Sequence, residues 1–116
     1  MIKLTRQEII QKLNYCFSAA SSATSKYLAD HPNEWYPCGF AQVNVHNGRS
    51  LLAKVLKEEY GAGKNYEQAG VYIWNPSNHS TQWMYAKEAG CRAFIEAMVY
   101  TGLCNMSEVS TSSRMD

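Results

Sequence analysis

The stretch from Gly39 to His46 alternates between two kinds of side chain, and this alternation constrains the fold more than any other feature of the chain. One set of positions is small and apolar: Ala41, Val43 and Val45. The positions between them carry an aromatic ring, two amides and an imidazole: Phe40, Gln42, Asn44 and His46. Successive side chains of a strand point to opposite faces, so the pattern predicts a strand with one buried and one accessible face. The accessible face is either ordinary polar sheet surface or a surface that recognises a ligand.

A long helix is predicted before this strand, over residues 6–29. Thr5 and Glu8 form a capping-box pattern, and apolar residues follow them at helical spacing. Pro32 ends the helix, because the residue before a proline is pushed out of the helical region. The small residues at 18–25 indicate either a break near Ser21 or a face that packs closely on another element.

Two further helices and one more strand are expected after the first strand. The helices are predicted over 49–60, with Gly61 as the C-cap, and over 84–101. Gly90, inside the last of these, indicates a close packing contact. The strand is predicted over 70–76, with the large side chains of Tyr72 and Trp74 on one face.

This order of elements predicts an α+β fold, in which a small sheet of about three strands packs against two or three helices. The 116 residues suit a single domain, divided into the N-terminal helix at 6–29, an α/β core at 36–106 and a C-terminal tail at 107–116. We place the third strand at Leu103-Cys104 and expect the Ser- and Thr-rich tail to be flexible. A small sheet has exposed edges, so we expect a homo-oligomer.

Composition excludes several classes of function. A net charge of +1 gives no broad positive field, so no nucleic acid polymer is expected as a partner, and an anionic ligand must be held by a few placed cations. The four cysteines are widely spaced and no apolar export segment opens the chain, which predicts reduced thiols. No apolar run reaches the roughly 18 residues of a membrane span.

Catalytic and cofactor motifs are missing from the sequence. His31, His46 and His79 do not have the paired spacing of a metal site, and we expect no cofactor. Cys38 and His46 lie eight positions apart on the predicted strand, which separates them by roughly 26 Å and excludes a direct catalytic dyad.

The other candidate residues are of types that bind a ligand without catalysing a reaction. Arg49 precedes a helix, where backbone N–H groups also favour an anion. Rings that could stack on a base and amides that could read its edges come from the two strands and their ends: Phe40, Asn44, Tyr72, Trp74 and Asn75. Each aromatic ring could instead belong to the core. If the face binds a ligand, truncating Phe40 or Asn44 should weaken binding and leave the melting temperature nearly unchanged.

Five short motifs resemble a group of short proteins encoded by tailed bacteriophages, most of which have no assigned function. The resemblance covers residues 36–116 and rests on these segments: Pro37-Cys38-Gly39-Phe40-Ala41, Arg49-Ser50, Trp74-Asn75-Pro76-Ser77, Lys87-Glu88-Ala89-Gly90 and Ser113-Arg114-Met115-Asp116. The set of candidate binding residues is also similar to that of phage anti-defence sponges, among them the Thoeris anti-defence proteins. These are small oligomers that bind a cyclic ADP-ribose or cyclic oligonucleotide signal without degrading it. That resemblance implies that Arg49 and Arg114 contact phosphate or ribose, with Phe40, Tyr72 or Trp74 stacking on the base.

The sequence therefore leads to one hypothesis and two alternatives. The hypothesis is an oligomeric phage protein of the host cytoplasm that sequesters a cyclic nucleotide immune signal, cyclic ADP-ribose or a cyclic oligonucleotide, without cleaving it. The first alternative is an inhibitor that binds a host protein directly, through the same aromatic residues. The second is a nucleotide phosphodiesterase that uses His46 or His79.

Overall fold

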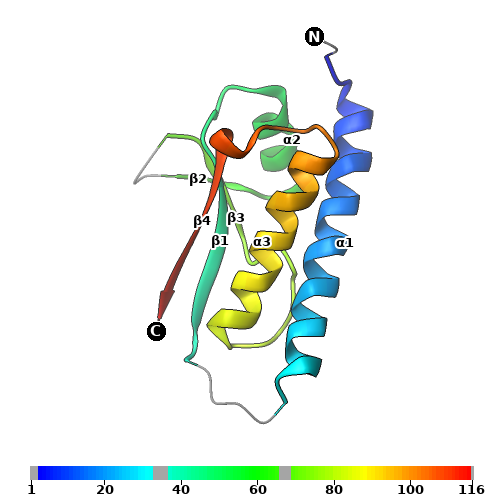
Figure 1. Ribbon diagram of the computed structural model, residues 1–116. Coiled ribbons are helices and arrows are strands. Elements are labelled where there is room, and N and C mark those ends of the chain that lie inside the picture. The colour runs from blue at the N-terminus through cyan, green and yellow to red at the C-terminus, as the bar shows by residue number, and fades with distance from the viewer. Residues whose placement is uncertain (1–2, 33–36, 66–68, 116) are drawn as a thin grey trace.

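The computed structural model describes residues 3–32, 37–65 and 69–115 (Figure 1). Trp35 and Tyr36 of the connector after the first helix, and Asp116, lie outside the described residues. In chain order the elements are α1 (Arg6–Asp30), β1 (Gly39–Val45), α2 (Leu51–Tyr60), β2 (Gly63–Lys64), β3 (Val71–Trp74), α3 (Met84–Tyr100), a 3₁₀ turn (Met106–Glu108) and β4 (Val109–Met115).

The fold has two layers, a sheet and a layer of helices. The strands of the described residues form one antiparallel sheet in the order β2-β3-β1-β4. Helices α1, α2 and α3 all lie on one side of it (Figure 1). The α+β prediction is confirmed, with four strands where about three were expected.

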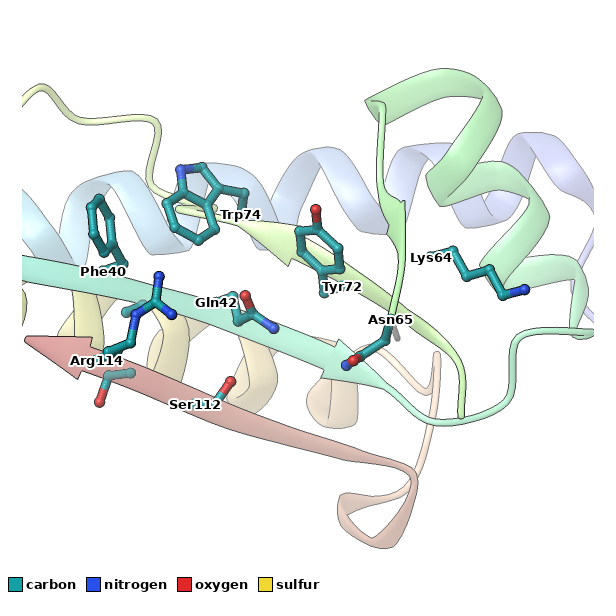
Figure 2. Close-up of a pocket in the computed structure, with 10 residues that line it drawn as sticks. Phe40, Gln42, Lys64, Asn65, Tyr72, Trp74, Ser112 and Arg114 are labelled. Carbon is teal, nitrogen blue, oxygen red and sulfur yellow. The ribbon is translucent and has the colours of Figure 1, made fainter. Parts of the chain in front are cut away.

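The alternation in β1 divides the sheet into a covered and an open face. Ala41, Val43 and Val45 are buried against the helices, together with Val71 and Ile73 of β3. The intervening residues of each strand point the other way, to the face that the helices of the described chain leave uncovered (Figure 2). One face of the sheet thus supplies the core, and the other is accessible from solvent.

The C-terminal segment is a strand and not a flexible tail. β4 pairs with β1 along its whole length, from Val45↔Val109 to Gly39↔Met115. The expected strand at Leu103-Cys104 is wrong, because those residues lie in the connection that follows α3. Serine-rich sequence has a weak intrinsic preference for strands, but the free edge of β1 supplies partners for the backbone of this segment, and Val109 anchors its first residue in the core.

The small residues of α1 form a packing face and not a break. A Cβ atom on Gly90 of α3 would lie 2.5 Å from Thr24 Oγ1 and 3.3 Å from the carbonyl oxygen of Ala20. Thr24 is fully buried, and its hydroxyl donates to the carbonyl of Ala86 at 2.9 Å. The two helices therefore approach so closely that α3 requires a glycine at this crossing.

The predicted helix ends are confirmed at two places. Thr5 and Glu8 form the capping box of α1, with bonds of 3.0 and 3.2 Å, and Gly61 ends α2 with a φ of 70°, in the left-handed region. No helix in the described part of the chain is both long enough and apolar enough to span a membrane.

Candidate functional site

The open face of the sheet carries a cavity of about 430 Å³. It lies over β1 and is bounded by β3 and the end of β2 on one side and by β4 on the other (Figure 2). Its lining consists of Phe40, Ala41, Gln42, Lys64, Asn65, Tyr72, Trp74, Ser112, Ser113 and Arg114.

Two aromatic rings stand together at one end of this cavity. Phe40 of β1 and Trp74 of β3 lie with ring centroids 5.0 Å apart and planes tilted by 36°. Trp74 remains 52% exposed, although it is one of the largest side chains of the protein. An exposed indole beside a second ring offers a flat apolar surface on which a planar ligand can stack.

Tyr72 lines the cavity further along the same face, and its position depends on Gly63. A Cβ atom on Gly63 would lie 2.6 Å from Cε1 of the Tyr72 ring. Any other residue at this position of β2 would push the ring away. The pairing Gly63↔Tyr72 thus places the phenol over the backbone of the short strand.

Two cations flank the ring of Phe40. Arg114 is its partner on β4, and the guanidinium carbon lies 5.9 Å from the ring centroid. Lys87 reaches the ring from α3, with Nζ 5.2 Å from the centroid, and donates to the carbonyl of Gly39 at 2.9 Å. Lys87 is only 9% exposed, so Arg114 is the cation that meets the cavity at this end.

The charged side chains in the described lining of the cavity are Arg114 and Lys64, and this lining includes no carboxylate. Arg114 supplies a planar cation that can bind an anionic ligand, although the chain as a whole is close to neutral.

Asn44 faces the same side of the sheet but is only 1% exposed. Its carbonyl oxygen accepts from Gln42 Nε2 at 2.8 Å and from Asn65 Nδ2 at 3.1 Å. Its amide nitrogen donates to Ser112 Oγ at 3.2 Å and to Ser110 Oγ at 3.4 Å. The side chain has therefore used its bonding capacity inside the protein and acts as a scaffold for its neighbours.

The hydrogen bonds of Asn44 determine which polar groups of Gln42 and Ser112 remain for a ligand. Because Gln42 donates through its amide nitrogen, its side-chain oxygen is left as an acceptor. Because Ser112 accepts from Asn44, its hydroxyl hydrogen is left as a donor. An acceptor and a donor thus lie side by side on paired residues of β1 and β4, two positions along these strands from Phe40 and Arg114 (Figure 2).

Of the residues proposed from the sequence, the structure brings Phe40, Tyr72, Trp74 and Arg114 together in the cavity and leaves the others outside its lining. Arg49 is exposed in the turn before α2, beyond the opposite end of β1 from Phe40. The N-terminus of α2 is capped by the hydroxyl of Ser50, which accepts from the amide of Ala53 at 3.1 Å.

Asn75 also lies outside this cavity, in the turn that follows β3. Its side-chain nitrogen donates to the carbonyl of His79 at 3.1 Å, and its side-chain oxygen accepts from Ser77 at 3.0 Å. These bonds hold the turn together, in which Asn75 has a φ of 43°. The side-chain amide of Asn75, which the sequence suggests as a ligand contact, is therefore already hydrogen-bonded within its own turn.

Sequence reasoning missed the contribution of Lys64, Asn65 and Ser112 to the cavity. A signal existed for β4, because Ser110, Ser112 and Arg114 repeat with the period of a strand. For Lys64 and Asn65 we find no comparable signal, since β2 has only two residues and Asn65 follows its end.

The described lining of the cavity contains no histidine, cysteine or carboxylate, so its serine hydroxyls have none of these groups beside them as a general base. Burial raises the pKa of Cys16 and Cys104 to about 11 and that of Cys91 to about 12, so these thiols are protonated near neutral pH. His79 accepts from the amide of Thr81 at 3.0 Å, in a loop outside the cavity. Within the described ranges, three or more potential metal ligands do not converge anywhere.

Comparisons of the chain with protein-family models, with curated proteins and with solved structures found no match.

Proposed function

We propose that this protein binds a cyclic nucleotide signal in the cavity on its open sheet face and sequesters it without cleaving it, as an anti-defence protein of a phage. The observation that carries the proposal is the placement of the Phe40–Trp74 ring pair beside Arg114, in a cavity whose described lining has no acidic side chain.

A nucleotide combines the two features that this cavity complements. Its base is a flat π system, and stacking on an aromatic side chain contributes about 1–3 kcal/mol per base. Its phosphate is an anion, and the planar guanidinium of Arg114 can bond two phosphate oxygens at once. The distance of 5.9 Å between the Arg114 guanidinium carbon and the Phe40 ring is short enough for one ligand to contact both.

The size of the cavity supports a small ligand. Its volume of about 430 Å³ falls in the range of roughly 300–1,000 Å³ that is typical of small-molecule sites. The acceptor of Gln42 and the donor of Ser112 would then read the edge of the base or the hydroxyls of the ribose.

Sequestration is favoured over hydrolysis by the chemistry of the lining. Arginine, serine, amide and aromatic side chains bind and orient a nucleotide, whereas hydrolysis of a phosphodiester requires a positioned base or an activated nucleophile. The resemblance to phage anti-defence proteins directs the choice among nucleotides to cyclic immune signals.

Isothermal titration calorimetry against cyclic ADP-ribose isomers and cyclic di- and trinucleotides tests the proposal. We expect one of these ligands to bind with a Kd below about 1 μM, with linear AMP as a weaker comparator. The bound ligand is then released by heat and analysed by mass spectrometry, and we expect to recover it intact.

Two outcomes contradict the proposal. Absence of heat with every ligand, at protein concentrations above about 50 μM, would exclude a nucleotide sponge. Recovery of a linearised ligand would exclude sequestration and favour the phosphodiesterase alternative.

A further inference from the structure

We propose that two copies of this chain associate through their β4 strands, so that their sheets join into one continuous antiparallel sheet. This inference concerns the edge of the sheet and does not depend on the ligand proposed for its open face.

β4 is a long edge strand without the usual protection. It pairs with β1 over seven residues, while the strand at the other edge, β2, has only two. Edge strands are commonly protected by proline, lysine, a bulge or an inward-pointing charge. β4 has no proline and no lysine, its register with β1 is continuous, and its one charged residue, Arg114, points to the open face.

The hydrogen-bond phase of β4 shows which of its backbone groups are available. The amide of His46 donates to the carbonyl of Glu108 at 3.0 Å, which places these two residues at the position of a hydrogen-bonded pair in the ladder. In an antiparallel ladder such pairs alternate, so Ser112 bonds toward β1, whereas Thr111 and Ser113 direct their N–H and C=O groups outward.

A twofold axis at Ser112 pairs the whole of β4 with the second copy. Ser112 is the middle residue of Val109–Met115, so this register leaves no residue of the strand unpaired. Thr111 then lies opposite Ser113 of the second copy, and the outward groups of both strands meet in the correct phase.

The same axis determines which side chains of the two β4 strands lie opposite each other. Met115, which is 62% exposed, comes to lie opposite Val109 of the second copy, on the helix side of the sheet. Arg114 lies opposite Ser110 of the second copy, so the two guanidinium groups do not face each other. Both cavities lie on the same face of the joined sheet.

The charges on α3 complement each other about this axis. Ser113 donates to Glu88, and α3 and β4 run in opposite directions (Figure 1). One strand residue, about 3.3 Å, corresponds to roughly two helical residues of 1.5 Å, so the axis at Ser112 passes α3 near residue 90. Residue 90 is midway between Glu88 and Arg92, so Glu88 of each copy faces Arg92 of the other.

Both charged groups are available for such a pair. Glu88 uses Oε2 for Ser113, which leaves Oε1 for a second partner, and no ion pair forms between Glu88 and Arg92 within the described chain. Arg92 is exposed on α3.

Light scattering coupled to size-exclusion chromatography, without added ligand, tests the proposal at about 50 μM protein. We expect a particle of twice 13.1 kDa. Thr111→Pro removes one outward N–H and leaves the ladder to β1 intact, so it should shift the particle to the monomer mass, with circular dichroism confirming that the variant is folded.

A charge exchange provides the second arm of the experiment. Arg92→Glu should weaken the dimer at least tenfold, and the double variant Glu88→Arg/Arg92→Glu should restore it. A monomeric wild type would overturn the proposal, as would a dimer that neither Thr111→Pro nor Arg92→Glu weakens. Because no nucleotide is present, these results are independent of whether the cavity binds one.

Discussion

At the residue scale, Gln42 and Asn44 occupy the same face of β1 and have different roles. Asn44 is buried and makes four hydrogen bonds to its neighbours. Gln42 is partly exposed, lines the cavity and makes one of those bonds. Stability should therefore depend on Asn44, and ligand binding on Gln42.

We predict that Asn44→Ala lowers the free energy of unfolding by roughly 1–3 kcal/mol, because it leaves buried polar partners unsatisfied. Gln42→Ala should lower it by less than about 1 kcal/mol and should weaken nucleotide binding. Urea unfolding and calorimetry measure the two effects. Equal stability losses for both variants would contradict these roles.

The sequence predicts the shared face of Phe40, Gln42 and Asn44, because a period of two is a local property. It cannot predict that Asn44 is buried, because the groups that cover it, Asn65 and Ser112, come from distant segments. The sequence leads us to expect that truncating Asn44 leaves the melting temperature unchanged. The structure leads us to expect that this truncation lowers it.

At the scale of elements, the crossing of α1 and α3 is a close helix contact. It places Thr24 and Ala20 of α1 against Gly90 of α3. A glycine inside a helix lowers its stability by up to about 1 kcal/mol relative to alanine. We therefore attribute Gly90 to the close packing of the two helices.

Gly90→Ala should accordingly destabilise the protein, by about 1–3 kcal/mol, since the new methyl group would lie 2.5 Å from Thr24 Oγ1 and 3.0 Å from Ser77 Cβ. Ser21→Ala, at an exposed position of α1, is the matched control and should change stability by less than about 0.5 kcal/mol. The midpoint of urea unfolding reports both. If Gly90→Ala proved as stable as the wild type, the close crossing would be wrong.

Elements with local signals could be predicted from the sequence, and those without them could not. The start of α1 at Thr5 and the end of α2 at Gly61 are specified by side chains next to the boundary. β4 has few such signals, because serine and threonine also suit turns and flexible ends. Its structure depends on pairing with β1, which lies about 70 residues earlier in the chain.

At the scale of the whole molecule, the helices of the described chain cover only one face of the sheet (Figure 1). We propose functions for the uncovered face and for the exposed edge of the sheet. The order of elements predicts an α+β fold, but it does not determine which face each helix covers. The cavity with Phe40, Trp74 and Arg114 follows from that arrangement, as does the exposed edge of β4. The face is proposed to bind a ligand, and the edge a second copy.

The most direct test of the ligand site compares two arginines by calorimetric titration with the cyclic nucleotide that binds the wild type most tightly. Arg114 lines the cavity, and Arg49 lies outside it. We predict that Arg114→Gln weakens binding at least tenfold, a loss of about 1.4 kcal/mol, while Arg49→Gln binds like the wild type. Loss of binding in Arg49→Gln with unchanged binding in Arg114→Gln would contradict the assignment of the site to the open face.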